Sequence, residues 1–129
     1  MAVGVPWYVF AKGQCGLARV RMRTVTESRL IDGRLELRRS DDDKQPLLRR
    51  LNKIEGQVRG LRTMIEEDRY CLDEVQQINA VTAALREVAL LIISQHVAQG
   101  VQLAVREQES DGAVEDVMRV LKAAMRMRD

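Results

Sequence analysis

The sequence contains few of the residues on which many small proteins depend. Its 129 residues include two cysteines, two prolines, one histidine and four aromatic residues, three of which lie in the first ten positions. Two cysteines cannot build the disulfide framework of a small secreted domain, so we expect a cytoplasmic protein with reduced thiols. The N-terminus lacks the continuous apolar segment of a signal peptide, and no apolar run approaches the ~20 residues of a membrane span. The sequence thus predicts no membrane partner, and its aliphatic, proline-poor composition favours helices.

Residues that carry out catalysis are equally scarce. The chain has no glycine-rich phosphate loop and no paired carboxylates beyond ordinary surface ones. Its single histidine, His96, does not stand in a pattern that suggests a Ser-His-Asp triad. We therefore predict that the protein is not an enzyme.

Composition divides the chain into two parts. Hydrophobic residues make up 46% and charged residues 31%, which is the balance of one soluble globular domain. Residues 1–40 hold four of the eight glycines and show neither a helical nor a strand period, so we expect a poorly ordered N-terminal arm, in which Cys15 has no partner. Residues 41–129 are predicted to form one helical domain.

Positive charge is concentrated in two segments although the net charge is only +2. Residues 1–40 carry eight basic and three acidic side chains, and residues 44–62 carry six basic side chains and one acidic one. A basic cluster on a rigid helix is typical of a site for a polyanion such as nucleic acid. The alternative interpretation is an ordinary solvated helix face.

The first predicted helix begins after an acidic cap. Residues 40–43 read Ser-Asp-Asp-Asp, which favours a helix start, and Pro46 suits a first turn. Apolar residues then recur at spacings of 4, 3, 4, 3 and 4, which predicts a helix over ~44–66. Gly56 and Gly60 each cost about 1 kcal/mol relative to Ala, so we expect something to approach their face closely. The apolar positions are Leu47, Leu51, Ile54, Val58, Leu61 and Ile65.

The second predicted helix carries one apolar seam with a cysteine at one end and the histidine at the other. No glycine or proline interrupts residues 61–99, and the spacing predicts a helix over ~69–106. A helix of this length is typical of a bundle formed between chains. A break at Ser110-Asp111-Gly112 and a third helix complete an all-α fold. The seam consists of Cys71, Val75, Ile78, Thr82, Leu85, Ala89, Ile92 and His96.

Cys71 and His96 share a helix face but lie far apart along it. A helix places them within about 20° of each other around its axis and roughly 37 Å apart. A second chain packed antiparallel brings the cysteine of one copy to the histidine of the other, and the small residues Ala83 and Ala84 lie at the midpoint. Thiolate and imidazole together suit Cu(I) or Zn(II). The alternative is that both residues are only packed within the seam.

Three segments resemble those of a known family. They read LLRRLNKIEGQVRGL (47–61), MIEEDRYCLDEVQQINAV (64–81) and ALREVALLIISQHVAQGV (84–101). Together they resemble the copper-sensitive operon repressor family of bacterial regulators, which includes nickel/cobalt- and formaldehyde-responsive repressors. The resemblance implies three helices per chain, an antiparallel four-helix bundle formed by a dimer, and a dimer of dimers. It also implies repression through double-stranded operator DNA, bound without a helix-turn-helix and released when an inducer binds.

The resemblance also implies roles for individual residues. Cys71 and His96 match metal ligands, and Tyr70 matches a tyrosine beside the site. Cu(I) is the predicted inducer, with Zn(II) or Ni(II) as alternatives. Basic side chains suit phosphate contacts. The resemblance and the basic segment 44–62 together give the positions expected to bind DNA. These are Arg49, Arg50, Lys53, Gln57, Arg59 and Arg86.

One position departs from the family pattern. Gly100 stands where copper sensors have a second cysteine and nickel sensors a histidine. A metal would then need an exogenous ligand or a carboxylate from Asp41–Asp43, Glu115 or Asp116. Alternatively, Cys71 responds to formaldehyde or another electrophile as a nucleophile and no metal is involved, although the N-terminal proline of the formaldehyde branch has no match here. A structural helical oligomer without sensing is the remaining hypothesis.

Overall fold

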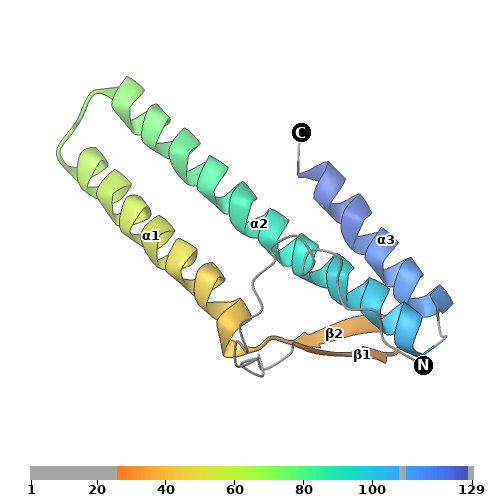
Figure 1. Cartoon of the computed structure of the whole chain (residues 1–129). Coiled ribbons are helices and arrows are strands. Elements are labelled where there is room, and N and C mark those ends of the chain that lie inside the picture. Colours follow the sequence, from red (N-terminus) through yellow and green to blue (C-terminus); the bar gives the residue numbers. More distant parts are fainter. Residues whose placement is uncertain (1–25, 108–109, 128–129) are drawn as a thin grey trace, which may run out of the picture.

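The computed structural model describes residues 26–107 and 110–127, and it consists of three helices and a two-stranded hairpin (Figure 1). The predicted all-helical architecture is confirmed, with the hairpin as an addition. The elements in chain order are β1 (Glu27–Ile31), β2 (Arg34–Arg38), α1 (Asp41–Glu66), α2 (Cys71–Glu107) and α3 (Ser110–Arg126).

Helix α1 starts at the predicted cap. Ser40 is the N-cap residue, and its hydroxyl accepts a hydrogen bond of 3.2 Å from the Asp43 amide. Three aspartates in the first turn lie at the positive end of the helix dipole. Pro46 lies inside the helix, early enough that α1 continues past it to Glu66. The helix therefore begins three residues before the start predicted at residue 44 and six before Leu47, the first residue of the apolar period.

Helices α1 and α2 form an antiparallel helical hairpin (Figure 1). Its small core consists of Leu47 and Ile54 from α1 and Val81 and Val88 from α2. Helix α2 has 37 residues and is roughly 55 Å long, so α1 covers only part of its length. The C-terminal half of α2 packs instead against α3 and the β-hairpin.

The β-hairpin differs from the irregular arm expected for this segment. Asp32 and Gly33 both have positive φ, 49° and 70°, as a two-residue type I′ turn requires. The Asp-Gly pair between Ile31 and Arg34, with alternating apolar residues on both sides, was the available signal. Strands of only five residues give a weak alternation of apolar and polar side chains, and the basic, glycine-rich sequence around them obscured it. Residues 1–25, including Cys15, lie outside the described part of the chain.

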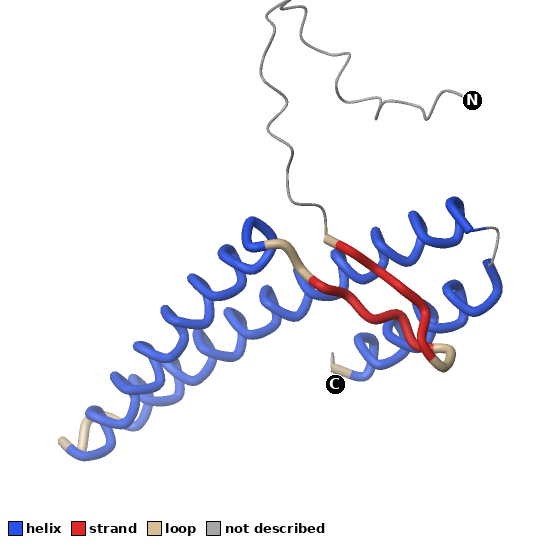
Figure 2. The backbone as a smooth tube through the Cα atoms, turned by 90° about the horizontal axis from the view of Figure 1, so that it is seen from below, coloured by secondary structure: helices blue, strands red, loops and turns tan. Residues whose placement is uncertain are grey.

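The hairpin and α3 build a second core at the far end of α2. Leu35 from β2, Leu103 from α2 and Ala113 from α3 are its buried members. Figure 2 shows the strands lying across this end of the molecule, beside α2 and α3. Gly112 lies within α3 rather than in the predicted break, because α3 already starts at Ser110. A Cβ there would lie 2.7 Å from Leu30 Cδ2, so the close hairpin explains this glycine.

Helix α2 leaves much apolar surface uncovered by its own chain. By length and composition it is apolar enough to cross a membrane, so the lack of an uninterrupted apolar run does not by itself exclude a span. Core helices of soluble bundles meet the same criterion. Only 17% of its most apolar window is buried within the single chain, which leaves a large face available to a partner.

Candidate functional site

His96 lies near the C-terminal end of α2, in a polar site that other elements of the same chain form around it. Its side chain is 13% exposed, and its Nε2 is 2.9 Å from the Asp116 Oδ2 of α3. The Asp116 side chain is 7% exposed. A carboxylate accepts hydrogen bonds, so this contact favours the proton on Nε2 and leaves the lone pair of Nδ1 for another partner.

Asp116 is itself held by two further groups. The backbone N–H of Leu35 in β2 donates to Oδ2 over 3.1 Å, and Arg119 Nη1 donates to Oδ1 over 3.1 Å. The buried carboxylate therefore accepts bonds from three different elements and has a cationic neighbour. Asp116 is also the member of the suggested carboxylate set that contacts His96; Glu115 pairs with Arg119 at 3.9 Å.

Cys71 lies in contrasting surroundings at the other end of α2. It is the first residue of the helix, and both its side chain and that of Tyr70 are exposed, Tyr70 by 70%. The helix is continuous to His96, so the two residues remain roughly 37 Å apart within one chain. Among the described residues of a single chain, no three His, Cys, Asp or Glu side chains gather as a metal site. The expectation that one chain cannot unite Cys71 with His96 is met.

Gly100 is the place where α2, α3 and the hairpin come closest. It is buried, and a Cβ built on it would clash with Val117 Cγ2 and lie 3.4 Å from Leu35 Cδ2. A cysteine or histidine side chain at this position has no room in the present packing. The missing third ligand thus has a structural cause, because this chain's own α3 and hairpin occupy its space.

The seam predicted on α2 forms part of an uncovered apolar surface. Its large aliphatic members remain 39–50% exposed even though α1 packs on the same helix. Neighbouring apolar side chains of α1 extend the surface. A contiguous exposed apolar face of this kind marks an interaction site. The exposed members are Val75, Ile78, Leu85 and Ile92 on α2 and Leu48, Leu51, Val58 and Ile65 on α1.

The basic residues predicted to bind DNA lie on α1 and α2. Arg50 Nη1 pairs with Glu87 Oε2 at 2.7 Å, and both side chains are about half exposed or more. Gln57 is half-buried, and its Oε1 has no hydrogen-bond partner among the described residues. A shallow hollow between the helices is lined by Arg50, Lys53, Ile54, Gln57, Ala84 and Glu87. The remaining predicted positions, Arg49, Arg59 and Arg86, are exposed.

The glycines of α1 have no close neighbour among the residues that the structure describes. A Cβ on Gly60 would meet nothing within 4 Å, and one on Gly56 would reach only Arg59 Nη2 at 4.0 Å. The described residues therefore supply no close approach to this face. The expected approach remains a prediction about a partner molecule.

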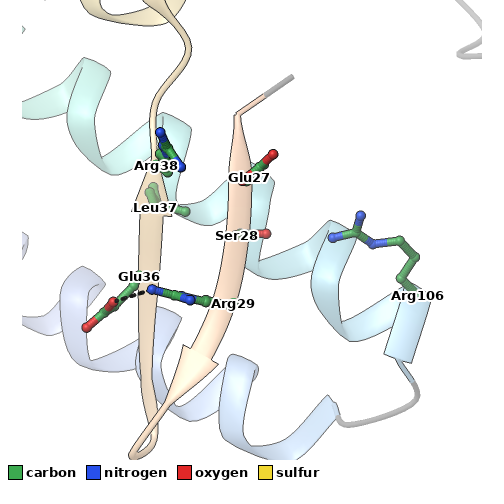
Figure 3. Close-up of a pocket in the computed structure, with 7 residues that line it drawn as sticks. All are labelled: Glu27, Ser28, Arg29, Glu36, Leu37, Arg38 and Arg106. Carbon is green, nitrogen blue, oxygen red and sulfur yellow. Dashed lines mark ion pairs between the residues drawn. The ribbon is translucent and has the colours of Figure 1, made fainter. Parts of the chain in front are cut away.

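A separate cavity, lined by neither Cys71 nor His96, lies beside the hairpin (Figure 3). Its lining mixes charges of both signs, and Arg29 pairs across the strands with Glu36 at 4.0 Å. None of the residues predicted for the metal or DNA sites lines it. The cavity is formed by Glu27, Ser28, Arg29, Glu36, Leu37, Arg38 and Arg106.

The fold and its surfaces define a helical protein with a basic helical surface, an unpaired apolar face and a polar site around one histidine. Comparison with known proteins gives the family. The sequence model of the metal-sensitive transcriptional repressors matches residues 43–123, and the chain belongs to this family.

Relatives of known function and structure support the assignment. The copper-sensing transcriptional repressor CsoR of Bacillus subtilis is 39% identical over 84 residues, which cover 65% of this chain and 83% of that protein. The copper-sensing transcriptional repressor RicR of Mycobacterium tuberculosis is 52% identical over 64 residues, covering 50% and 67%. The crystal structure of the copper-sensing repressor CsoR with Cu(I) from Geobacillus thermodenitrificans superposes with a TM-score of 0.62 at 36% identity, covering 68% of this chain and 92% of that one. The nickel-responsive transcriptional regulator InrS gives 0.59 at 34% identity, covering 62% and 90%.

Proposed function

We propose that this repressor binds operator DNA in its metal-free form and releases it when Cu(I) binds between Cys71 of one subunit and His96 of the partner subunit. The observation that carries the proposal is the contrast along one face of α2. The Nε2 atom of His96 is engaged by Asp116, and its Nδ1 has no hydrogen-bond partner among the described residues. Cys71 lies exposed at the other end of the uncovered seam.

An antiparallel dimer accounts for the uncovered seam. Two copies of α2 crossing near Ala83 and Ala84 would bury each other's aliphatic seam residues and, with α1 from each copy, form a four-helix bundle. The two-fold symmetry creates two equivalent Cys71–His96 sites per dimer. Apolar residues outside the seam, such as Leu90 at 66% exposure, would stay exposed in this dimer. They are available for the pairing of dimers into a tetramer.

The ligand set favours Cu(I) over the alternative metals. Thiolate and imidazole are soft and borderline ligands, and soft thiolate ligation selects Cu(I) among the ions considered. Zn(II) sites almost always have four ligands, whereas here Gly100 supplies none and Asp116 is already bonded to His96. Asp116 therefore acts as the residue that orients His96, and an exogenous thiol would complete the coordination. The relatives named as copper-sensing support the same choice.

DNA would bind through the basic surface of α1 and α2. Phosphate contacts from Arg and Lys provide most of the affinity, and Arg49, Arg59 and Arg86 are exposed for this purpose. Arg50 would first have to exchange Glu87 for a phosphate. Joining two chains through the Cys71–His96 sites changes how the basic surfaces of the assembly are placed. Release follows if the metal-linked arrangement binds DNA less well than the metal-free one. Such a repressor acts in the cytoplasm, where its operator lies.

The test is a fluorescence anisotropy titration on the promoter DNA that the wild-type protein protects. Cu(I), Zn(II), Ni(II) and formaldehyde are added separately to the wild type, to Cys71→Ala and to Cys15→Ala, which serves as the matched cysteine control. We expect Cu(I) to release DNA from the wild type and from Cys15→Ala but not from Cys71→Ala.

Each other outcome favours a different hypothesis. Release by formaldehyde alone, with loss in Cys71→Ala, would identify an electrophile sensor. Release by Zn(II) or Ni(II) but not Cu(I) would replace the metal. Unchanged DNA affinity with every agent would overturn the sensing function, and a lack of any salt-dependent DNA binding would favour the structural oligomer.

A further inference from the structure

The β-hairpin reaches the carboxylate that orients the histidine. Leu35 N–H and His96 Nε2 both bond the same atom, Asp116 Oδ2, at 3.1 and 2.9 Å. These three residues come from β2, α2 and α3. The hairpin lies outside the segment matched by the family model, which begins at residue 43. This chain thus adds its own element to the surroundings of His96.

The register of the hairpin leaves the Leu35 amide free to make this bond. With a two-residue turn, Ile31 and Arg34 form the hydrogen-bonded closing pair, so the next pair, Leu30 and Leu35, is a non-hydrogen-bonded one. The N–H of Leu35 therefore points away from β1. It meets Asp116 of α3 instead of the partner strand.

Side chains fix the hairpin against the same site. The Leu35 side chain packs beside Gly100, in the space where a third ligand would otherwise project. At the hairpin's end, Arg39 Nε donates to Gln95 Oε1 over 2.7 Å, and Gln95 Nε2 donates to the Asp43 carbonyl over 3.2 Å. The residue before His96 is thus bonded to both the end of the hairpin and the start of α1.

The outward face of the hairpin argues against a role as a DNA-binding ribbon. Its cross-strand pairs place Glu27 opposite Arg38 and Arg29 opposite Glu36, so the charges largely compensate each other. The inward face carries Leu30, which packs with Leu35 and Leu37 against α2 and α3. The hairpin has the pattern of a cover for the His96 end of the molecule.

We propose that the β1–β2 hairpin is a positioning element of the sensor site. The Leu35 amide holds Asp116 in place, and Asp116 in turn keeps His96 in the tautomer that presents Nδ1 to the metal. The expected effect on metal binding rests on the proposed function. The effect of the hairpin on the His96 tautomer does not depend on it. Loss of the group that orients a ligating histidine, here Asp116, typically lowers metal affinity by about 10- to 100-fold, and the Leu35 amide acts one contact further out, so the lower end of this range is expected.

The test compares two proline substitutions in the full-length protein. Leu35→Pro removes the amide that bonds Asp116 without removing a bond between the strands, because that amide points away from β1. Leu37→Pro is the matched control, since it has the same register two residues further on and is not bonded to Asp116. Because His96 is the only histidine of the chain, its ¹⁵N side-chain resonances report the tautomer without assignment problems.

We expect the Nε2–H tautomer in the wild type and in Leu37→Pro, and a mixture of both tautomers in Leu35→Pro. Cu(I) affinity should fall by about 10-fold in Leu35→Pro only, while the DNA affinity of the metal-free protein is unchanged. An unaltered tautomer and Cu(I) affinity in a folded Leu35→Pro variant would overturn the proposal. If wild type binds no Cu(I) but its tautomer still depends on Leu35, the sensing function fails and the positioning role stands.

A second measurement covers the case in which Leu35→Pro does not fold. In the wild type, the Leu35 amide should exchange slowly with solvent deuterium, although it takes no part in the strand pairing. In Asp116→Ala it should exchange quickly, while the amides that pair β1 with β2 remain protected. Fast exchange of Leu35 in the wild type would contradict the role of this bond.

Discussion

The two ends of α2 present the same helix face to different surroundings. At the C-terminal end this face carries His96 and Gly100, and α3 and the hairpin cover it with a buried carboxylate and packed leucines. At the N-terminal end it carries Cys71 and Val75, and both are exposed. The comparison teaches that the nitrogen half of the proposed metal site is organised within one chain. In the proposed dimer, the sulfur half would become part of a site only when a second chain covers the seam.

The largest effect is expected when the exposed seam of α2 can no longer pair with a second chain. Leu85→Glu places a charge in the middle of the seam, and each uncompensated buried charge would cost roughly 3–5 kcal/mol in the dimer. Sedimentation equilibrium should show a folded monomer. Gln76→Glu, on the far side of the helix from the seam, should leave the oligomeric state unchanged. A Leu85→Glu variant that assembles like the wild type would show that the seam is not the interface.

Removing either ligand should abolish the response to Cu(I), which for allosteric regulators typically amounts to about 5- to 150-fold in affinity. The two ends should nevertheless differ in stability. Cys71→Ala alters an exposed side chain and should change unfolding free energy by less than about 0.5 kcal/mol. His96→Ala removes a partner from buried Asp116 and should cost about 1–3 kcal/mol. Urea unfolding with DNA titration measures both effects, and equal stability losses would contradict the comparison.

Replacing a glycine by alanine should lower the stability of the protein at Gly100 and raise it at Gly60. Gly100→Ala forces Val117 away from α2 and should destabilise by about 1–3 kcal/mol. Gly60→Ala meets no neighbour within residues 26–107 and 110–127 and should stabilise α1 by up to about 1 kcal/mol. Thermal unfolding measures both, and adding Val117→Ala should restore part of the Gly100→Ala loss. If Gly60→Ala weakens DNA binding or assembly, the predicted close approach to that face is made by a partner.

The smallest effect is expected at the exposed ion pair between α1 and α2. Glu87→Gln frees Arg50 from its partner and should strengthen DNA binding by no more than about 1 kcal/mol. Arg50→Ala should weaken binding and reduce the salt slope by about one phosphate contact. Arg29→Ala on the hairpin is the control, because its surroundings are charge-compensated and it should change neither quantity. An unchanged slope for Arg50→Ala would remove this residue from the DNA surface.

Much of the helical architecture could be predicted because its signals are local. Ser40 and the aspartates after it mark the start of α1, and the 3–4 spacing of apolar residues marks both long helices, since a helix is defined by contacts between residues three and four apart. The same period places Cys71 and His96 on one face and far apart, so the sequence already required a second chain for any site that uses both. The family follows from the same segments.

The surroundings of His96 depended on contacts between distant elements. Asp116 was one of several carboxylates that the sequence offered, and only the packing of α3 on α2 brings it to His96. The hairpin has short strands whose stability comes from packing Leu35 and its neighbours on the helices, so its local signal is weak. The sequence by itself thus determined the long helices and the face they share. The tertiary structure decided which carboxylate holds the histidine and why residue 100 is a glycine, because both follow from how closely α3 and the hairpin approach α2.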